Sequence, residues 1–256
     1  MRIYINLFAF SLIILQSGRI FGAISGVDSF DTHDSSKWSV EGSGEIQVNN
    51  GRAELQLNSG EEAGYKWILN YANKSQTWDA AIDVMLPQSG LEQDEMAGII
   101  LRSFWKNPPV PGYSVGLTVE REGFGSNIIE GEYIAEKLTA SNFTELDSAS
   151  TLSTGVSLKI AWDASAELFS FFYDDNGGQD SWTLLTTTGI TGWGMNDSDE
   201  FGIEIIGWAS DADILYSDGL AFDNFSAKTA SAIPEPGAIM LFGFLGFPFL
   251  TRIKRK

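Results

Sequence analysis

The sequence predicts an all-β domain, a two-sheet antiparallel sandwich, flanked by an N-terminal signal peptide and a short C-terminal hydrophobic helix. Three observations favour the sandwich. Short segments alternate apolar and polar residues with a period of two, which is typical of half-buried strands. Turns rich in Gly, Asn, Asp and Ser separate these segments. No segment shows a convincing amphipathic helical pattern, so we expect two stacked sheets rather than a mixed fold.

Two hairpins are the clearest local features. Residues 45–48 and 52–57 alternate in polarity around Asn49-Asn50-Gly51, a turn that favours tight hairpins. Residues 157–162 and 168–173 form a second candidate hairpin, and the turn at 174–180 leads to a strand at 182–188. Further strands are expected at 65–71, 77–86, 96–104, 113–120, 127–138, 201–208 and 219–228.

The first 25 residues read as a secretory signal peptide. Arg2 supplies positive charge, an apolar segment follows, and Ala23-Ile24-Ser25 fits a small-x-small cleavage site. We place the cut after Ser25. The alternatives are a cut after Ala23 or an uncleaved N-terminal anchor.

The last residues combine three parts. Pro234, Glu235 and Pro236 stop the preceding strand and extend the backbone. Ala238 to Leu250 is apolar, and a basic end follows that resists membrane crossing; its stop-transfer residues are Arg252, Lys254, Arg255 and Lys256. A helix over the apolar part would be about 20 Å long, shorter than the hydrocarbon core of about 30 Å. A plain membrane anchor is therefore the less favoured alternative.

This tail resembles the PEP-CTERM sorting signal of Gram-negative bacteria that make extracellular polysaccharide. The resemblance implies processing by an exosortase, transient anchoring in the inner membrane, and a final location in the cell envelope, at the outer surface or in the extracellular matrix. The expected organisation is a signal peptide at 1–25, a β-sandwich at 26–228, a linker at 229–233 and the sorting signal at 234–256.

The net charge of the chain indicates which classes of binding partner to expect. The chain carries a net charge of −18. Without the two end segments, 10 basic and 33 acidic residues remain, which gives the middle a charge of −23. Such a surface repels phosphate backbones, so we expect no nucleic-acid binding. The chain has no cysteine, which excludes disulfides and thiolate metal sites.

The middle segment resembles concanavalin A-like (laminin-G-like) jelly rolls. Asp28-Ser29-Phe30-Asp31 with Lys37-Trp38 resembles their first strand, and Phe222-Asp223-Asn224-Phe225 resembles their closing strand. Residues 97–102 and 112–117 resemble their central strand pair. The resemblance implies a jelly roll in which the first and last strands pair.

One pair of acidic residues is a candidate for catalysis. Glycoside hydrolases of this superfamily carry acids at alternate positions of one strand, and alternation places such residues on one face. Glu200 and Glu204 match two of these positions, but Gly202 occupies the third. The only histidine, His33, lies among turn residues. We therefore assign no catalytic residue and keep Glu200 and Glu204 as candidates.

Aromatic residues suggest carbohydrate binding, because sugars stack on exposed rings. Trp105 and Tyr113 flank a proline-rich loop, and Trp193 lies between two glycines. The alternative is that these rings close the ends of the core, as we expect of Trp67, Trp78, Trp162 and Trp208 on strands.

Calcium is the candidate cofactor. The resemblance implies a site near the first and last strands, where Asp31 and Asp223 would meet. Acidic turns at 174–180 and 197–200 resemble fragments of oxygen-ligand loops, but neither has EF-hand spacing.

Together these features predict an exported, non-catalytic protein that binds extracellular polysaccharide. The alternatives are a glycoside hydrolase or lyase that uses Glu200 and Glu204, or a structural envelope protein without a ligand.

Overall fold

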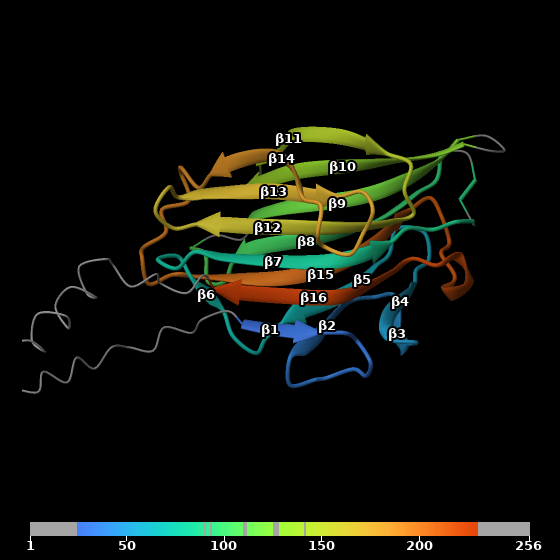
Figure 1. Ribbon diagram of the computed structural model, residues 1–256, viewed down its shortest axis with the longest axis horizontal. Helices are drawn as coiled ribbons and strands as arrows, with labels where there is room; N and C mark the ends of the chain where they lie inside the picture. The colour runs from blue at the N-terminus through green and yellow to red at the C-terminus, as the bar shows by residue number, and fades with distance from the viewer. Residues whose placement is uncertain are drawn as a thin grey trace, which may run out of the picture.

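The computed structural model describes residues 25–89, 91–92, 94–109, 112–124, 128–140 and 142–229, and these form two stacked antiparallel sheets (Figure 1). In sheet A the strand order is β14-β13-β12-β7-β16-β4-β3, with β1 paired to β16. Its strands are β1 (Ser25–Asp28), β3 (Glu45–Asn49), β4 (Arg52–Gln56), β7 (Trp78–Met85), β12 (Gly155–Asp163), β13 (Leu168–Asp174), β14 (Thr183–Gly189) and β16 (Ala221–Thr229).

In sheet B the strand order is β11-β10-β9-β8-β15-β5-β2, with β6 paired to β15. Its strands are β2 (Trp38–Gly42), β5 (Glu62–Trp67), β6 (Ala72–Asn73), β8 (Met96–Trp105), β9 (Tyr113–Phe124), β10 (Ile128–Thr139), β11 (Asn142–Thr151) and β15 (Glu200–Ser210). A short 3₁₀ turn, η1 (Tyr216–Asp218), precedes β16. The predicted all-β sandwich is confirmed.

Both predicted hairpins form. In β3–β4 the turn residues Asn50 and Gly51 have positive φ values of 52° and 76°, as a tight hairpin of this type requires. In β12–β13 the pairing runs from Ser157 opposite Asp174 to Asp163 opposite Leu168. Strand β11, by contrast, was not predicted, because it is a largely exposed edge strand without a buried face to produce alternation.

The first and last strands pair, as the resemblance implied. Ser25 lies opposite Lys228 and Asp28 lies opposite Phe225. Beyond this pairing, β16 bulges against β7 between Asp223 and Ser226, and Asn224 has a left-handed φ of 50°. The bulge interrupts the alternation of β16 side chains between the two faces of the sheet, so it changes which side chains point outward near the β1–β16 junction.

The hydrophobic core lies between the sheets and contains two aromatic clusters. One surrounds Phe30, with Trp38, Tyr65 and Phe222 within 5.8 Å between ring centroids. The other surrounds Phe169 near Trp162 and Phe201. Buried rings of this size contribute most of the apolar area removed from water.

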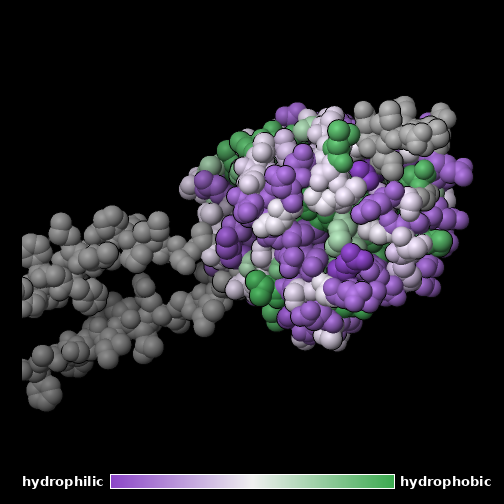
Figure 2. All heavy atoms as spheres, turned by 45° about the vertical axis from the view of Figure 1, so that its right-hand side comes forward, coloured by the Kyte–Doolittle hydropathy of each residue, from purple (hydrophilic) through white to green (hydrophobic). Residues whose placement is uncertain are grey.

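Trp208 corrects one sequence expectation, because it is not in the core. It is partly exposed on the outer face of β15, while Ile203 and Ile205 fill the core positions of that strand. Outside the core, hydrophilic side chains cover most of the face seen in Figure 2, with hydrophobic ones scattered among them.

The termini fall outside this description. Residues 1–24 of the predicted signal peptide, residues 230–233 of the predicted linker, and the sorting signal with its expected hydrophobic helix lie outside the described residues. Ser25, predicted to end the signal peptide, is the first residue of β1, and Thr229, predicted to begin the linker, is the last residue of β16. In the part of the chain that the structure describes, no helix has the length and apolarity needed to cross a membrane.

Candidate functional site

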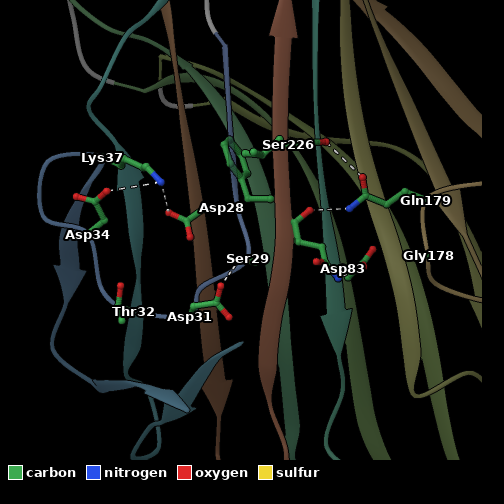
Figure 3. Close-up of a pocket in the computed structure, with 13 residues that line it drawn as sticks. Asp28, Ser29, Asp31, Thr32, Asp34, Lys37, Asp83, Gly178, Gln179 and Ser226 are labelled. Atoms are coloured by element: carbon green, nitrogen blue, oxygen red, sulfur yellow. Dashed lines mark hydrogen bonds and ion pairs between the residues drawn. The ribbon is translucent and has the colours of Figure 1, made fainter. Parts of the chain in front are cut away.

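A polar pocket of about 500 Å³ opens on the outer face of sheet A, where β1 meets β16. Figure 3 shows β16 running between its two sides, with Asp28, Asp34 and Lys37 on one side and Asp83, Gly178 and Gln179 on the other. The pocket therefore joins segments from the beginning, middle and end of the domain.

The floor of the pocket is the bulge in β16. The Asn224 side-chain amide donates a hydrogen bond to the Asp83 carboxylate at 2.9 Å. The Gln179 side-chain amide donates to the backbone carbonyl of Asn224 at 2.7 Å, and the Ser226 hydroxyl donates to the Gln179 carbonyl oxygen at 3.3 Å. These bonds hold Gln179 across the floor.

The turn between β13 and β14 carries Gln179, and Asp174 fixes that turn. The Asp174 side chain is fully buried and accepts hydrogen bonds from the backbone N–H groups of Asn176, Asp180 and Ser181. This arrangement explains the acidic turn at 174–180 that resembles a calcium loop. The carboxylate of Asp174 is already satisfied by backbone donors.

The loop between β1 and β2 forms the other wall. Asp28 is buried and accepts hydrogen bonds from the Trp38 indole at 2.9 Å and the Phe30 amide at 2.8 Å. Lys37 forms ion pairs with Asp28 at 3.4 Å and with Asp34 at 3.5 Å. Asp28 therefore stabilises the loop, whereas Asp31 accepts a hydrogen bond from the Ser29 hydroxyl and is exposed.

Acidic side chains repel one another at the edge of the pocket. Burial raises the pKa of the Asp223 carboxyl, and the charges of Asp83 and Asp31 raise it further. The predicted calcium residues Asp31 and Asp223 thus influence each other electrostatically. However, among the described residues no three acidic or histidine side chains converge in a way that would hold a metal ion. In the described part of the chain, Asp31 and Asp223 have no third side chain of this kind placed to complete a metal site with them, so the predicted pair does not by itself make a calcium site.

The structure brings Trp105, Tyr113 and Trp193 together, but inside the end of the core. The Tyr113 ring lies 5.5 Å from Trp105 and 5.7 Å from Trp193, between ring centroids. Trp105 is 6% exposed and Trp193 is 2% exposed. Buried rings offer no open face to a sugar, so their position matches the core-packing alternative.

The candidate acids Glu200 and Glu204 are each paired with a cation, Glu204 with one in β8 and Glu200 with one directly after it. Lys106 binds Glu200 at 2.8 Å and Arg102 binds Glu204 at 3.0 Å. Burial raises the pKa of the Glu204 carboxyl, against the opposing effect of Arg102. At Gly202, a Cβ would lie 2.2 Å from the Phe104 ring, so that ring occupies the place of the third acid. These contacts stabilise the sheet face.

The comparisons with known proteins give the fold. No protein-family model and no curated protein matches the chain. Among solved structures, the CBM2 module of the evolved Dit of Lactobacillus casei BL23 phage J-1 aligns over 82% of this chain and 97% of its own, with a TM-score of 0.57 and 9% identity. Peanut lectin aligns over 82% and 99%, with a TM-score of 0.54 and 9% identity. The chain has a legume-lectin-like jelly-roll fold.

A third similar structure is the carbohydrate recognition domain of Emp46p in its potassium-bound form. It aligns over 82% of this chain and 95% of its own, with a TM-score of 0.51 and 10% identity. Identities this low describe the fold of the chain alone.

Sequence reasoning missed most of the pocket. Asp83, Gln179 and Ser226 come from three distant segments, and no local motif joins them. The resemblance of the first and closing strands pointed to this region through Asp31 and Asp223, and the acidic turn at 174–180 contains Gln179.

Proposed function

We propose that this protein is an exported, non-catalytic protein that binds extracellular polysaccharide through the pocket at the β1–β16 junction. The observation that supports the proposal is the pocket itself, a polar depression bordered by the β1–β2 loop and the β13–β14 turn on a legume-lectin-like fold. Two of the similar structures are a lectin and a carbohydrate recognition domain, which supports a sugar as ligand.

The lining suits a neutral polyol. Sugar hydroxyls donate hydrogen bonds to carboxylates, and the accessible Asp31 and the pocket residue Asp83 supply these acceptors. Lys37 in one wall and the second amide hydrogen of Gln179 in the floor supply donors. Val27, which is 73% exposed, offers an apolar contact beside them. The volume falls in the usual range for small-molecule sites, roughly 300 to 1,000 Å³.

Export is the second part of the proposal. The signal peptide and the PEP-CTERM-like tail support transport across the inner membrane, processing by an exosortase and residence in the cell envelope or matrix. Polysaccharide is the polymer that such a location would offer. A glycoside hydrolase or lyase is less favoured, because cations hold both Glu200 and Glu204.

A binding experiment tests the pocket. The exported protein is run through native gels that contain the extracellular polysaccharide of the producing cells, beside the double variant Asp31→Ala/Gln179→Asn. Asparagine tolerates the left-handed φ of 60° at position 179 but is too short to keep the same contacts. We expect the polysaccharide to retard the wild type and the double variant to bind about tenfold more weakly or worse.

Asp211→Asn is the matched control, because Asp211 is exposed, has a left-handed φ of 57° and lies outside the pocket. Equal retardation of the wild type and the double variant would contradict the proposed pocket. Absence of retardation in every gel would contradict the proposed ligand.

A further inference from the structure

The outer face of sheet A carries a row of paired residues that begins beside the pocket, which we call the sheet A strip. From β1 to β14 the row consists of Val27, Ser226, Ala81, Lys159, Phe172 and Leu184, each opposite the next. Chain neighbours such as Phe225, Leu158 and Phe171 fill the core, so the row faces outward. Figure 1 shows β1, β16, β7, β12 and β13 side by side, and Val27 and Ser226 also line the pocket. The strip therefore leads away from the pocket across the sheet.

The turn between β13 and β14 folds back over this part of the sheet. Gln179 reaches β16, where its side chain bonds to Ser226 and to the backbone of Asn224. Three residues later, the Trp182 ring lies over Lys159 of β12, with 4.2 Å between the ammonium nitrogen and the ring centroid. Three residues span at most about 10 Å. One turn thus carries both a hydrogen-bonding group of the pocket and an aromatic ring of the strip.

Lys159 lies against two aromatic rings. Its ammonium nitrogen is 4.5 Å from the centroid of Phe172 and 4.2 Å from that of Trp182, and both rings are half-buried. In the described part of the chain, Lys159 makes no ion pair within 4 Å. Asp79 acts on its charge but is bound to Lys228 at 3.7 Å. An ammonium group has three N–H donors, so Lys159 can donate to a ligand that lies on the rings.

The strip is narrow, because polar rows border it on both sides. Asp79, Lys228 and Ser170 lie in the row on one side. Asp83 and Asp223 lie opposite each other in the row on the other side. A stable protein interface uses about 20 to 30 residues from each partner, far more than a single row supplies. A linear polymer with apolar faces and polar edges fits this shape better, and a chain of sugar rings has both.

The spacing of the strands sets the length of such a ligand. Lys159 lies two strands from Ser226 at the edge of the pocket, and Phe172 lies three strands from it. These separations are about 10 Å and 14 Å. A single sugar in the pocket does not reach the rings across this distance, whereas several linked sugars do.

We propose that the ligand is a neutral glycan of several linked sugars, whose chain continues from the pocket along the sheet A strip. One sugar stacks on the exposed part of the Trp182 and Phe172 rings, and Lys159 donates a hydrogen bond to its hydroxyl groups. The carboxylates of Asp79 and Asp83 beside the strip repel an acidic glycan, which favours a neutral one. The inference rests on the proposed function, because the pocket binds another part of the same chain.

Chain length tests the proposal. Neutral oligosaccharides are cut from the extracellular polysaccharide of the producing cells and separated into a short fraction of about two sugars and a long fraction of about seven. Calorimetry measures the affinity of the exported protein for each fraction. We expect the long fraction to bind about tenfold more tightly than the short one, because only the long chains reach the rings.

Three variants locate the added contact. Trp182→Ala should weaken the long fraction about tenfold and change the affinity for the short fraction less than about twofold, which also shows that the pocket remains folded. Lys159→Met keeps the length of the side chain but removes its donors, and it should weaken the long fraction about threefold. Trp208→Ala is the matched control, because Trp208 is a half-exposed indole on the outer face of sheet B. It should change either affinity less than about twofold.

Four results would overturn the proposal. They are equal affinity of the wild type for both fractions, undiminished binding of the long fraction by Trp182→Ala, equal weakening of both fractions by that variant, and equal weakening of the long fraction by Trp208→Ala. Sedimentation of the free protein adds a further outcome. A wild-type dimer that becomes a monomer in Trp182→Ala would assign the strip to a second copy of the chain.

The strip and the pocket fail separately in this experiment. The pocket variant Asp31→Ala/Gln179→Asn should weaken both fractions. If it weakens both while chain length has no effect, the pocket stands and the strip is refuted. If it weakens neither fraction, the function proposed for the pocket is refuted instead.

Discussion

Replacing Glu120 by glutamine should stabilise the folded protein at pH 8 and change its stability little near pH 4.5. Glu120 lies directly opposite Glu132 on the outer face of sheet B. Burial and four neighbouring glutamates raise its pKa from 4.5 to about 7. Glutamine keeps the shape of the side chain and removes the charge that the site disfavours.

The sign and size follow from linkage. A carboxyl whose pKa is higher in the folded state holds its proton more tightly there than in the unfolded chain. Below pH 4.5 both states are protonated and nothing is lost. As the pH rises from 4.5 to 7, stability decreases, and above pH 7 the loss is complete. A shift of this size corresponds to at most about 3 kcal/mol, and solvent at this partly exposed side chain reduces the effect to about 1 to 3 kcal/mol.

Urea denaturation at pH 4.5 and pH 8 measures the difference. Wild type, Glu120→Gln and the exposed-loop control Asp180→Asn are compared at both values. Glu120→Gln should gain stability at pH 8 alone, and the control should gain little at either pH. An equal gain at both pH values, or no gain at pH 8, would refute the electrostatic reasoning about this face.

Three other predictions concern the fold, the pocket and the termini. Asp174→Ala should cost about 1 to 3 kcal/mol in denaturant, because three backbone N–H groups of the turn lose their acceptor, and should weaken polysaccharide binding because the turn that holds Gln179 loosens; unchanged binding would contradict the link. Gly64→Ala should cost about 3 kcal/mol or more, because its Cβ would lie 2.0 Å from the backbone oxygen of Ile205; a melting temperature equal to that of the wild type would contradict this contact. Intact mass spectrometry of the protein from its own cells should find a chain that begins at Gly26 and lacks the basic end; full-length chains in the cytosol would contradict the proposed export.

Local patterns predicted those parts of the fold that local chemistry decides. The β3–β4 hairpin followed from alternation and from Asn50-Gly51, whose positive φ values the turn requires. The pairing of β1 with β16 followed from the resemblance of the two end segments. Strand β11 escaped prediction because its residues are mostly polar and one edge of it is unpaired.

The side chains of β15 show why register was harder to predict. Ile205 and Ile206 are adjacent and both buried, one in the core and one on the outer face. With apolar residues on both faces, alternation does not indicate which face Trp208 takes. The pairing of β15 with its neighbouring strands sets the register. It places Trp208 on the outer face of sheet B, in the same row as Glu120.

The candidate sites depend on contacts that no local window contains. The pocket needs the bulge at Asn224, which brings Asp83 and Gln179 together from distant strands and turns. The sequence made Trp105 and Trp193 candidates for sugar-binding platforms because both border loops, and it left core packing open as the alternative. In the structure the loop ends close over the core, and the two rings are buried there.

Chemical-shift mapping by NMR tests the central claim most directly. Oligosaccharides cut from the extracellular polysaccharide are titrated into the isotope-labelled exported protein, and the backbone amides are followed. The account predicts saturable shifts at Asp31, Gln179 and Asn224 around the pocket, with Trp193 unaffected. Shifts confined to another surface, or no shifts at millimolar sugar, would contradict it.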